Sequence, residues 1–258
     1  MRGGGGGLWL ICVIVAENRE RPYNPLDRVN LAHSVERALL ERPLTPLPPP
    51  TQFAGAGLYA IYYHGDFPAY APITPPRREK GEVPIYVGRA IPKGARAGVG
   101  SLLSTTTEPV LYRRLAEHAR SIQQAENLRL DDFSCRYLVV DDIWIPLAEA
   151  LLIMHYKPVW NRVLQGFGNH DPGSGRRPGA RPDWDEVHPG RPWAAKHTKP
   201  GRSREESLRL IEQHFASFEP PDLGRSHSVA TDVARAMMGD ERDDDGHSGD
   251  TSPLFDRV

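Results

Sequence analysis

The stretches GLYAIYY, at residues 57–63, and PIYVG, at residues 84–88, decide the fold of this chain. Both are rich in aromatic and β-branched residues and are bounded by glycine or proline, which is typical of short strands. Prolines at positions 68, 72, 75 and 76 indicate that the segment between the two stretches is a loop. The sequence therefore predicts two strands joined by a long hairpin loop.

Apolar residues at helical spacing predict helices on both sides of these strands. Leu31, Val35 and Leu39 share one face of a helix that the proline run at residues 43–50 ends, because proline lacks the amide donor. Leu111 and Ile122 mark the buried side of a second helix over residues 110–125. Further along the chain, residues 146–156 and 203–218 have the composition and pattern of two more helices.

A third strand is predicted over residues 133–140, where FSCRYLVV alternates and then becomes fully apolar. The predicted fold class is α/β (α+β): a small mixed or antiparallel sheet flanked by helices. An N-terminal helix precedes the sheet, and an irregular, glycine- and proline-rich extension over residues 161–202 follows it. This order of elements excludes a doubly wound parallel sheet.

Three regions follow from composition. Residues 1–23, with five consecutive glycines, are expected to be a disordered leader, although a short apolar run leaves open a signal peptide. Residues 24–218 are expected to form one domain. Residues 219–258, with ten acidic and four basic residues, are expected to be a disordered tail.

The distribution of charge and the number of cysteines indicate which kinds of binding partner and which compartment suit this chain. The tail has a net charge of −6 and the whole chain −1, so residues 1–218 have a net charge of +5. A mildly basic body suits a protein that binds phosphate groups, and many other proteins as well. Two cysteines, Cys12 and Cys135, provide neither a disulfide framework nor a zinc site, which indicates a reducing compartment.

Several polar residues have ordinary structural interpretations when each is taken alone. A tyrosine in a strand, such as Tyr59 or Tyr86, usually packs half-buried. Arg114 and His118 are four residues apart on a helix and therefore neighbours on its surface. Glu149 lies in an otherwise apolar helix, where its side chain either is buried or points to water. Asn161 follows that helix and has the position of a turn residue or cap.

Taken together, these residues supply what phosphodiester hydrolysis requires. The reaction needs a base to activate water, a cation at the transition state and a metal at the leaving oxygen. Glu149 is a candidate ligand for Mg²⁺, and Arg114 for the phosphate. A tyrosine acts as the base only where a neighbour stabilises its phenolate, because its ordinary pKa is about 10. His118, one turn from Arg114, is a candidate for accepting that proton.

The same residues carry a resemblance to a known family. GLY at 57–59 and YVG at 86–88, followed in order by Arg114, His118, Glu149 and Asn161 on the expected elements, resemble the GIY-YIG nuclease superfamily. Leu58 and Val87 depart from the motif but remain apolar. The likeness to the type II restriction endonucleases of this fold covers about residues 24–218. It rests on LPPPTQFAGAGLYAIYY, PIYVGRAIP, DFSCRYLVV, EALLIMHYKPVWN, GFGNHDPGSGR and DWDEVHPGRPWA.

The resemblance implies a cytoplasmic, metal-dependent endonuclease that cuts double-stranded DNA at a short, GC-rich palindrome as a homodimer. It implies one Mg²⁺ per active site, for which Mn²⁺ is expected to substitute, with Glu149 as its protein ligand. A cognate DNA methyltransferase is the expected partner in the same system, and no membrane is involved. The catalytic residues that it implies are Tyr59, Tyr86, Arg114, His118, Glu149 and Asn161.

Some assignments stay open at this stage. Tyr59 with His118 is favoured as the base, but the resemblance leaves Tyr86 almost equally eligible. Arg89, Arg176 and Arg177 are candidates for DNA contacts, since arginine binds both phosphate and guanine, although each also suits a solvated surface.

The tryptophans at 184 and 193 are interpreted as core packing or as anchors of a dimer interface. Three functions are weighed. The favoured one is a restriction endonuclease, ahead of a structure-specific repair or homing-type nuclease and of a non-catalytic DNA-binding module of the same fold.

Overall fold

The computed structural model describes residue 24 and residues 27–77, 82–92, 106–171 and 179–218. The predicted leader and acidic tail lie outside these residues, as do Arg176 and Arg177. Among the described residues, no helix combines the length and apolar character that crossing a membrane requires.

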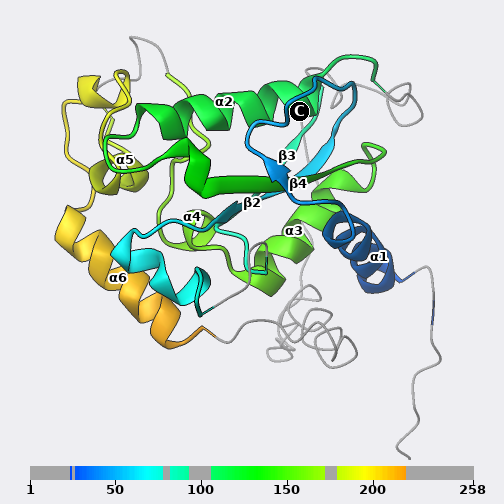
Figure 1. Ribbon diagram of the computed structural model, residues 1–258, viewed down its shortest axis with the longest axis horizontal. Helices are drawn as coiled ribbons and strands as arrows, with labels where there is room; N and C mark the ends of the chain where they lie inside the picture. The colour runs from blue at the N-terminus through cyan, green and yellow to red at the C-terminus, as the bar shows by residue number, and fades with distance from the viewer. Residues whose placement is uncertain (1–23, 25–26, 78–81, 93–105, 172–178, 219–258) are drawn as a thin grey trace, which may run out of the picture.

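A four-stranded antiparallel sheet forms the centre of the fold (Figure 1). Its strands are β1 (Thr45–Pro46), β2 (Gly57–Tyr63), β3 (Tyr86–Ala90) and β4 (Phe133–Val139), in the spatial order β1-β4-β2-β3. The two stretches that decide the fold pair directly, with Tyr59 opposite Gly88. All seven residues of β2 are buried, because this central strand is covered on both faces.

Helices cover the two faces of the sheet, as Figure 1 shows for α2 (Val110–Gln124) on one side and α3 (Ile145–Tyr156) with α1 (Arg28–Leu40) on the other. Alternate residues of β2 supply the two cores. Tyr59, Ile61 and Tyr63 pack with α2, and the intervening residues pack with α1 and α3. The predicted class, an α/β fold with a small mixed or antiparallel sheet flanked by helices, is confirmed, and the sheet is antiparallel.

The structure contains short elements that the sequence pattern did not predict. β1 lies in the proline run at residues 43–50, where it pairs only with β4 at the edge of the sheet, a position that tolerates proline. A 3-10 helix, η1 (Pro68–Ile73), occupies part of the predicted hairpin loop. A second short 3-10 turn, η3 (Leu130–Asp132), leads into β4. A one-turn helix, α4 (Val159–Arg162), contains Asn161, so the interpretation of this residue as a turn or cap beyond the helix is wrong.

The extension after α4 is more regular than its composition suggested. It contains α5 (Asp183–Val187), η5 (Ala194–Lys196) and α6 (Arg204–Ala216), the last close to the predicted helix at 203–218. Trp184 of α5 is fully buried and packs against Trp160 with ring centroids 5.5 Å apart. Within the described part of the extension, Trp184, Val187 and Ile211 therefore belong to the α2-side core.

Candidate active site

Two adjacent strands and helix α2 bring Tyr59, Tyr86 and His118 together. The hydroxyl of Tyr59 and Nε2 of His118 are 2.6 Å apart and share a hydrogen bond. The ring centroid of His118 lies 5.3 Å from that of each tyrosine, and the two tyrosine rings are 6.2 Å apart. Tyr59 and His118 are buried, whereas Tyr86 is partly exposed. The structure thus places both motif tyrosines around one imidazole.

Gly88 makes this approach possible. A Cβ atom at this position would lie 2.4 Å from the Tyr59 hydroxyl and 3.0 Å from the ring of Tyr86. Both contacts are too close for a side chain, and the tyrosine rings are rigid. The glycine of the second motif therefore lets the phenol of Tyr59 cross the neighbouring strand to reach His118.

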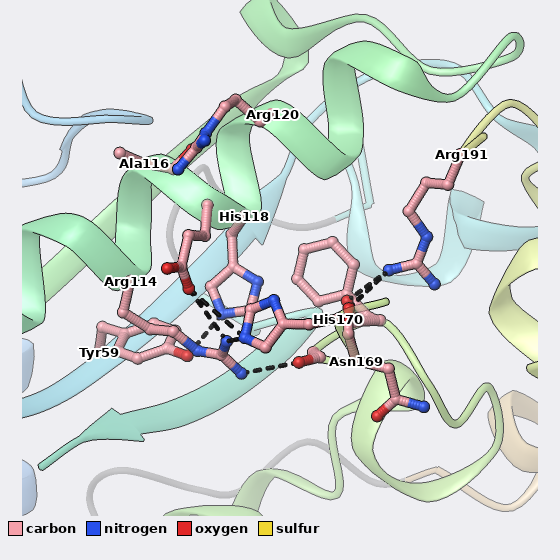
Figure 2. Close-up of polar contacts among 11 residues, drawn as sticks. Tyr59, Arg114, Ala116, His118, Arg120, Asn169, His170 and Arg191 are labelled. Atoms are coloured by element: carbon pink, nitrogen blue, oxygen red, sulfur yellow. Dashed lines mark hydrogen bonds and ion pairs between the residues drawn. The ribbon is translucent and has the colours of Figure 1, made fainter. Parts of the chain in front are cut away.

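Arg114 lies one helical turn from His118, and its guanidinium is held by several groups (Figure 2). Its Nη2 donates a hydrogen bond of 2.9 Å to the carbonyl of Gly168. Its Nη1 pairs with Glu117 at 3.2 Å and contacts the ring of His170. The charge of Arg114 acts on the ionisation of Tyr59, Tyr86 and His118. The structure therefore brings a fixed cation beside the two phenols.

Burial keeps the reacting groups neutral. Burial raises the pKa of Tyr59 well above its ordinary value, and neighbouring Tyr86 adds to this, while Arg114 opposes it. Burial likewise raises the pKa of Tyr86, against the opposing charge of Arg114. Burial and the charge of Arg114 lower the pKa of His118 well below its ordinary value. The hydrogen bond therefore joins a protonated phenol to a neutral imidazole.

Glu149 lies on α3, which packs on the other face of the sheet, and its charge acts on both motif tyrosines. Its carboxylate pairs with the guanidinium of Arg89, with Oε2 and Nε 3.0 Å apart. Burial raises the pKa of Glu149, and the charge of Arg89 opposes this rise. The charge of Glu149 also contributes to the raised pKa values of Tyr59 and Tyr86. The structure thus assigns Arg89 a contact within the site, in addition to any contact with DNA.

The residues fit a divalent cation that is held by one carboxylate. Among the described residues, no group of three or more histidine, cysteine or acidic side chains is suited to hold a metal ion. Glu149 is partly exposed, and Mg²⁺ characteristically binds through one or two carboxylates while keeping several water ligands. Glu149, a single partly exposed carboxylate, is therefore the candidate residue that would hold such an ion.

Asn161 fixes the outer edge of β3. Its Nδ2 donates to the carbonyl of Val87, and its Oδ1 accepts from the amide of Val87, both at 2.8 Å. Next to it, the amide of Trp160 donates to the carbonyl of Ile85 at 3.1 Å. The side chain of Asn161 therefore replaces a neighbouring strand, and its contacts are with the backbone that carries Tyr86 rather than with the reacting groups.

The loop of residues 166–170 completes the site, although its composition did not point to a site role. The ring of Phe167 stacks on His118, with centroids 4.6 Å apart and planes at 17°, and meets Tyr86 edge-on at 5.0 Å. His170 contacts Arg114 and lies 3.5 Å from Glu117. The signal in the sequence is GFGNH at 166–170, an aromatic residue between two glycines.

Other histidines and tryptophans take structural positions. Nε2 of His188 bonds to the Tyr70 hydroxyl at 2.6 Å and its Nδ1 to Asn127 at 2.9 Å. Nδ1 of His155 bonds to Glu36 at 2.6 Å. Trp193 lies over the guanidinium of Arg191, whose carbon is 4.6 Å from the ring centroid. The contact with Arg191 supports the interpretation of Trp193 as a packing residue, and full burial supports the same interpretation for Trp184.

Comparison of the chain with known protein families identifies one family to which it is similar. A family model described as the Eco29kI GIY-YIG domain matches residues 51–216, more than half of the chain. The chain belongs to this family. The match includes every residue of the site from Tyr59 to Asn161 and also the loop at 166–170. A comparison with curated proteins gives no match.

Membership in the Eco29kI GIY-YIG domain family defines the general chemistry. It is a restriction-type nuclease family, whose members are hydrolases that act on DNA. The resemblance inferred from the two tyrosine motifs is therefore confirmed at the level of the family and of the fold.

Proposed function

We propose that the chain is a type II restriction endonuclease that hydrolyses both strands of duplex DNA at a short palindrome. The observation that carries the proposal is the 2.6 Å hydrogen bond between the Tyr59 hydroxyl and His118, beside Arg114 and Tyr86. Family membership supports the reaction class, and the arrangement of side chains supports the roles below.

Tyr59 and His118 form the proton path. Water that attacks the phosphorus gives its proton to the Tyr59 oxygen, and the phenolic proton passes to Nε2 of His118, which becomes imidazolium. Burial disfavours both a free phenolate and a free imidazolium, so the two transfers are coupled. Since Tyr59 is the tyrosine bonded to His118, its assignment as the base is favoured over that of Tyr86.

The remaining residues hold the phosphate and the water. Arg114, fixed by Gly168, binds the phosphate oxygens on which negative charge develops. Tyr86 orients the attacking water or the phosphate from the neighbouring strand. Glu149 would hold one Mg²⁺, or Mn²⁺ in its place, which when bound stabilises the leaving oxygen. Asn161 keeps β3, and with it Tyr86, in position.

The remaining parts of the proposal follow from the family and from symmetry. A palindromic site has two-fold symmetry, so a homodimer supplies one active site per strand. Arg89, Arg176 and Arg177 are the proposed DNA contacts. We propose a GC-rich site and a cytoplasmic location, with a cognate methyltransferase that protects the host DNA.

The test is cleavage of long unmethylated duplex DNA with Mg²⁺, followed by sequencing of the product ends. We expect discrete fragments with ends that share one symmetric site, and no cleavage by Glu149→Ala. Glu126→Ala, an exposed glutamate outside the site, is the matched control and should cut normally. The proposal fails if the wild-type chain does not cut, if Glu149→Ala cuts equally well, or if branched DNA is cut in preference to plain duplex.

A further inference from the structure

Residues 166–170 form a loop that contacts three of the proposed catalytic groups at once. Phe167 stacks on His118 and meets the ring of Tyr86. The carbonyl of Gly168 accepts the hydrogen bond of Arg114 at 2.9 Å. A Cβ atom on Gly168 would lie 2.9 Å from the Tyr86 hydroxyl, so this backbone lies directly against the site. The conformation of the loop therefore sets where the guanidinium of Arg114 lies.

Arg191 holds this loop from the side opposite the site (Figure 2). Its Nη1 donates to the carbonyl of Phe167 at 2.9 Å and to that of Asn169 at 3.4 Å, and its Nη2 donates to the carbonyl of Gly166 at 3.0 Å. The carbonyls on both sides of Gly168 are thus bound to Arg191, whereas that of Gly168 accepts from Arg114. The guanidinium of Arg191 therefore holds the loop, and the loop in turn holds the guanidinium of Arg114.

The surroundings of Arg191 keep it rigid. Its side chain is buried and forms a two-point ion pair with Asp185, in which Nε and Oδ1 are 2.6 Å apart and Nη2 bonds to Oδ2. Its guanidinium carbon lies 4.5 Å from the Trp184 ring centroid and 4.6 Å from that of Trp193. The ion pair with Asp185, the two tryptophan rings and the loop carbonyls together hold the guanidinium of Arg191 in one orientation.

Stability alone does not require such a pair. A buried ion pair is often replaced by apolar residues of similar volume without loss of stability, because desolvation offsets the attraction. A planar guanidinium, however, is suited to bind a carboxylate and several carbonyls at fixed angles. The contacts of Arg191 are of this kind, and they end at a backbone that touches the proposed active site.

We propose that Arg191, paired with Asp185, is a positioning residue for Arg114 that acts through the loop of residues 166–170. This inference rests on the proposed nuclease function. The hydrogen bonds of Arg191 go to Asp185 and to the carbonyls of the loop rather than to Tyr59 or His118, although its charge contributes to the lowered pKa of His118. Its proposed contribution is the fixed orientation of the phosphate-binding guanidinium of Arg114.

The test is a double-mutant cycle on the full chain. The paired variant Arg191→Met with Asp185→Leu removes both charges together, which preserves packing and avoids an unpaired buried charge. We expect it to lower the single-turnover cleavage rate on the order of 100-fold, as expected for a misplacement of about 1 Å, with little change in KM. In an Arg114→Met background the same pair of changes should lower the rate by less than about threefold, because the residue it positions is absent.

Two further variants separate positioning from folding. Arg191→Lys keeps a positive charge beside Asp185 but cannot hold the three carbonyls, so we expect it to fold normally and remain slow. Arg202→Met, which breaks an ion pair with Asp183 in the same extension, is the matched control and should cut at the wild-type rate. Full activity of Arg191→Lys, or additive effects in the cycle, would overturn the proposal.

A readout without cleavage separates this inference from the proposed function. In the wild-type chain, the Nη2–H resonance of Arg114, which donates to the carbonyl of Gly168, should be sharp and protected from exchange in nitrogen-edited NMR spectra. In the paired variant it should broaden or exchange with solvent, while the backbone amides of α2 remain unchanged. If the chain does not cut DNA but this change appears, the nuclease proposal fails and the positioning holds; an unaltered Arg114 resonance overturns the positioning.

Discussion

Tyr59 and His118 share a hydrogen bond inside a buried environment that opposes charge on either ring. At the scale of single residues, this has a direct consequence for catalysis. Because the pKa of Tyr59 is raised, its phenol is protonated near neutral pH, and in the proposed mechanism the phenolic proton passes to the imidazole that lies 2.6 Å away. The charge of Arg114 favours the phenolate of Tyr59, and together with His170 and Arg191 it disfavours the imidazolium of His118.

Removal of the Tyr59 hydroxyl should therefore affect the rate rather than the fold. We expect Tyr59→Phe to lower single-turnover cleavage about 10²- to 10⁴-fold, the usual contribution of a general base, with little loss of DNA affinity. Tyr62→Phe is the matched control, because Tyr62 lies on the other face of the same strand. Cleavage rates within about threefold of wild type for Tyr59→Phe, with a large loss for Tyr86→Phe, would reverse the two assignments.

The pair of Arg89 and Glu149 predicts how metal affinity depends on pH. In the proposed site a metal binds the ionised carboxylate, so we expect Mn²⁺ affinity to be complete above the raised pKa of Glu149 and to be lost as the pH falls through it. Arg89 opposes the rise of this pKa. Arg89→Met should therefore move the loss of Mn²⁺ binding to higher pH and, well above that pKa, strengthen binding about tenfold, because a competing cation is gone.

Titration calorimetry with Mn²⁺ over a range of pH, without DNA, measures both effects. Arg113→Met is the control, since Arg113 pairs with Glu108 on the exposed side of α2 and not with Glu149. An unchanged pH profile in Arg89→Met would show that the pair does not compete with the metal.

At the scale of elements, the outer edge of β3 carries backbone polar groups that need hydrogen-bond partners from outside the sheet. Among the described residues, β3 has a strand neighbour on the β2 side only, so without Asn161 the polar groups of Val87 on the other side would face no strand. Asn161 satisfies both groups at 2.8 Å, and Trp160 binds the carbonyl of Ile85. Helix α4 thus closes the edge that carries Tyr86.

Loss of the Asn161 side chain should loosen this edge. We expect Asn161→Ala to lower the free energy of unfolding by about 1–3 kcal/mol, because it leaves the amide and carbonyl of Val87 without partners. Hydrogen exchange at the Val87 amide should accelerate, while amides of β4 keep their protection. Arg162→Ala, an exposed neighbour in α4, is the control. Unaltered exchange at Val87 would contradict this role for Asn161.

At the scale of the whole molecule, charge is divided between a body and a tail. Residues 219–258 carry a net charge of −6, and the remainder of the chain a net charge of +5. DNA phosphates attract the body and repel the tail over distances comparable to the Debye length, about 10 Å at 0.1 M salt. The two parts therefore have opposite effects on association with DNA.

Deletion of residues 219–258 should strengthen binding to duplex DNA at low salt, by about tenfold, with the difference shrinking as salt rises. Fluorescence anisotropy with labelled duplex at several salt concentrations measures this. A full-length chain whose tail carries Asn and Gln in place of Asp and Glu should behave like the deletion. Equal affinities of deletion and wild type at low salt would exclude an electrostatic effect of the tail.

The amino-acid sequence by itself determined three of the four strands described, the main helices and the family. GLYAIYY and PIYVG contain enough aromatic and β-branched residues to specify strands, and the alternation along residues 57–63 assigns Tyr59 and Tyr62 to opposite cores. Arg114 and His118 are neighbours because four residues span one helical turn. Strands, their two faces and neighbours on one helix all follow from the spacing of residues within one short segment of sequence.

Tertiary structure decided the contacts between segments distant in the sequence. Asn161 pairs with Val87, Arg89 with Glu149, and Arg191 with the loop that holds Arg114, and no local pattern encodes these contacts. β1 within the proline run depends likewise on pairing with β4. The physical reason is that periodicity specifies which face of an element is apolar, whereas polar partners are selected by packing between elements.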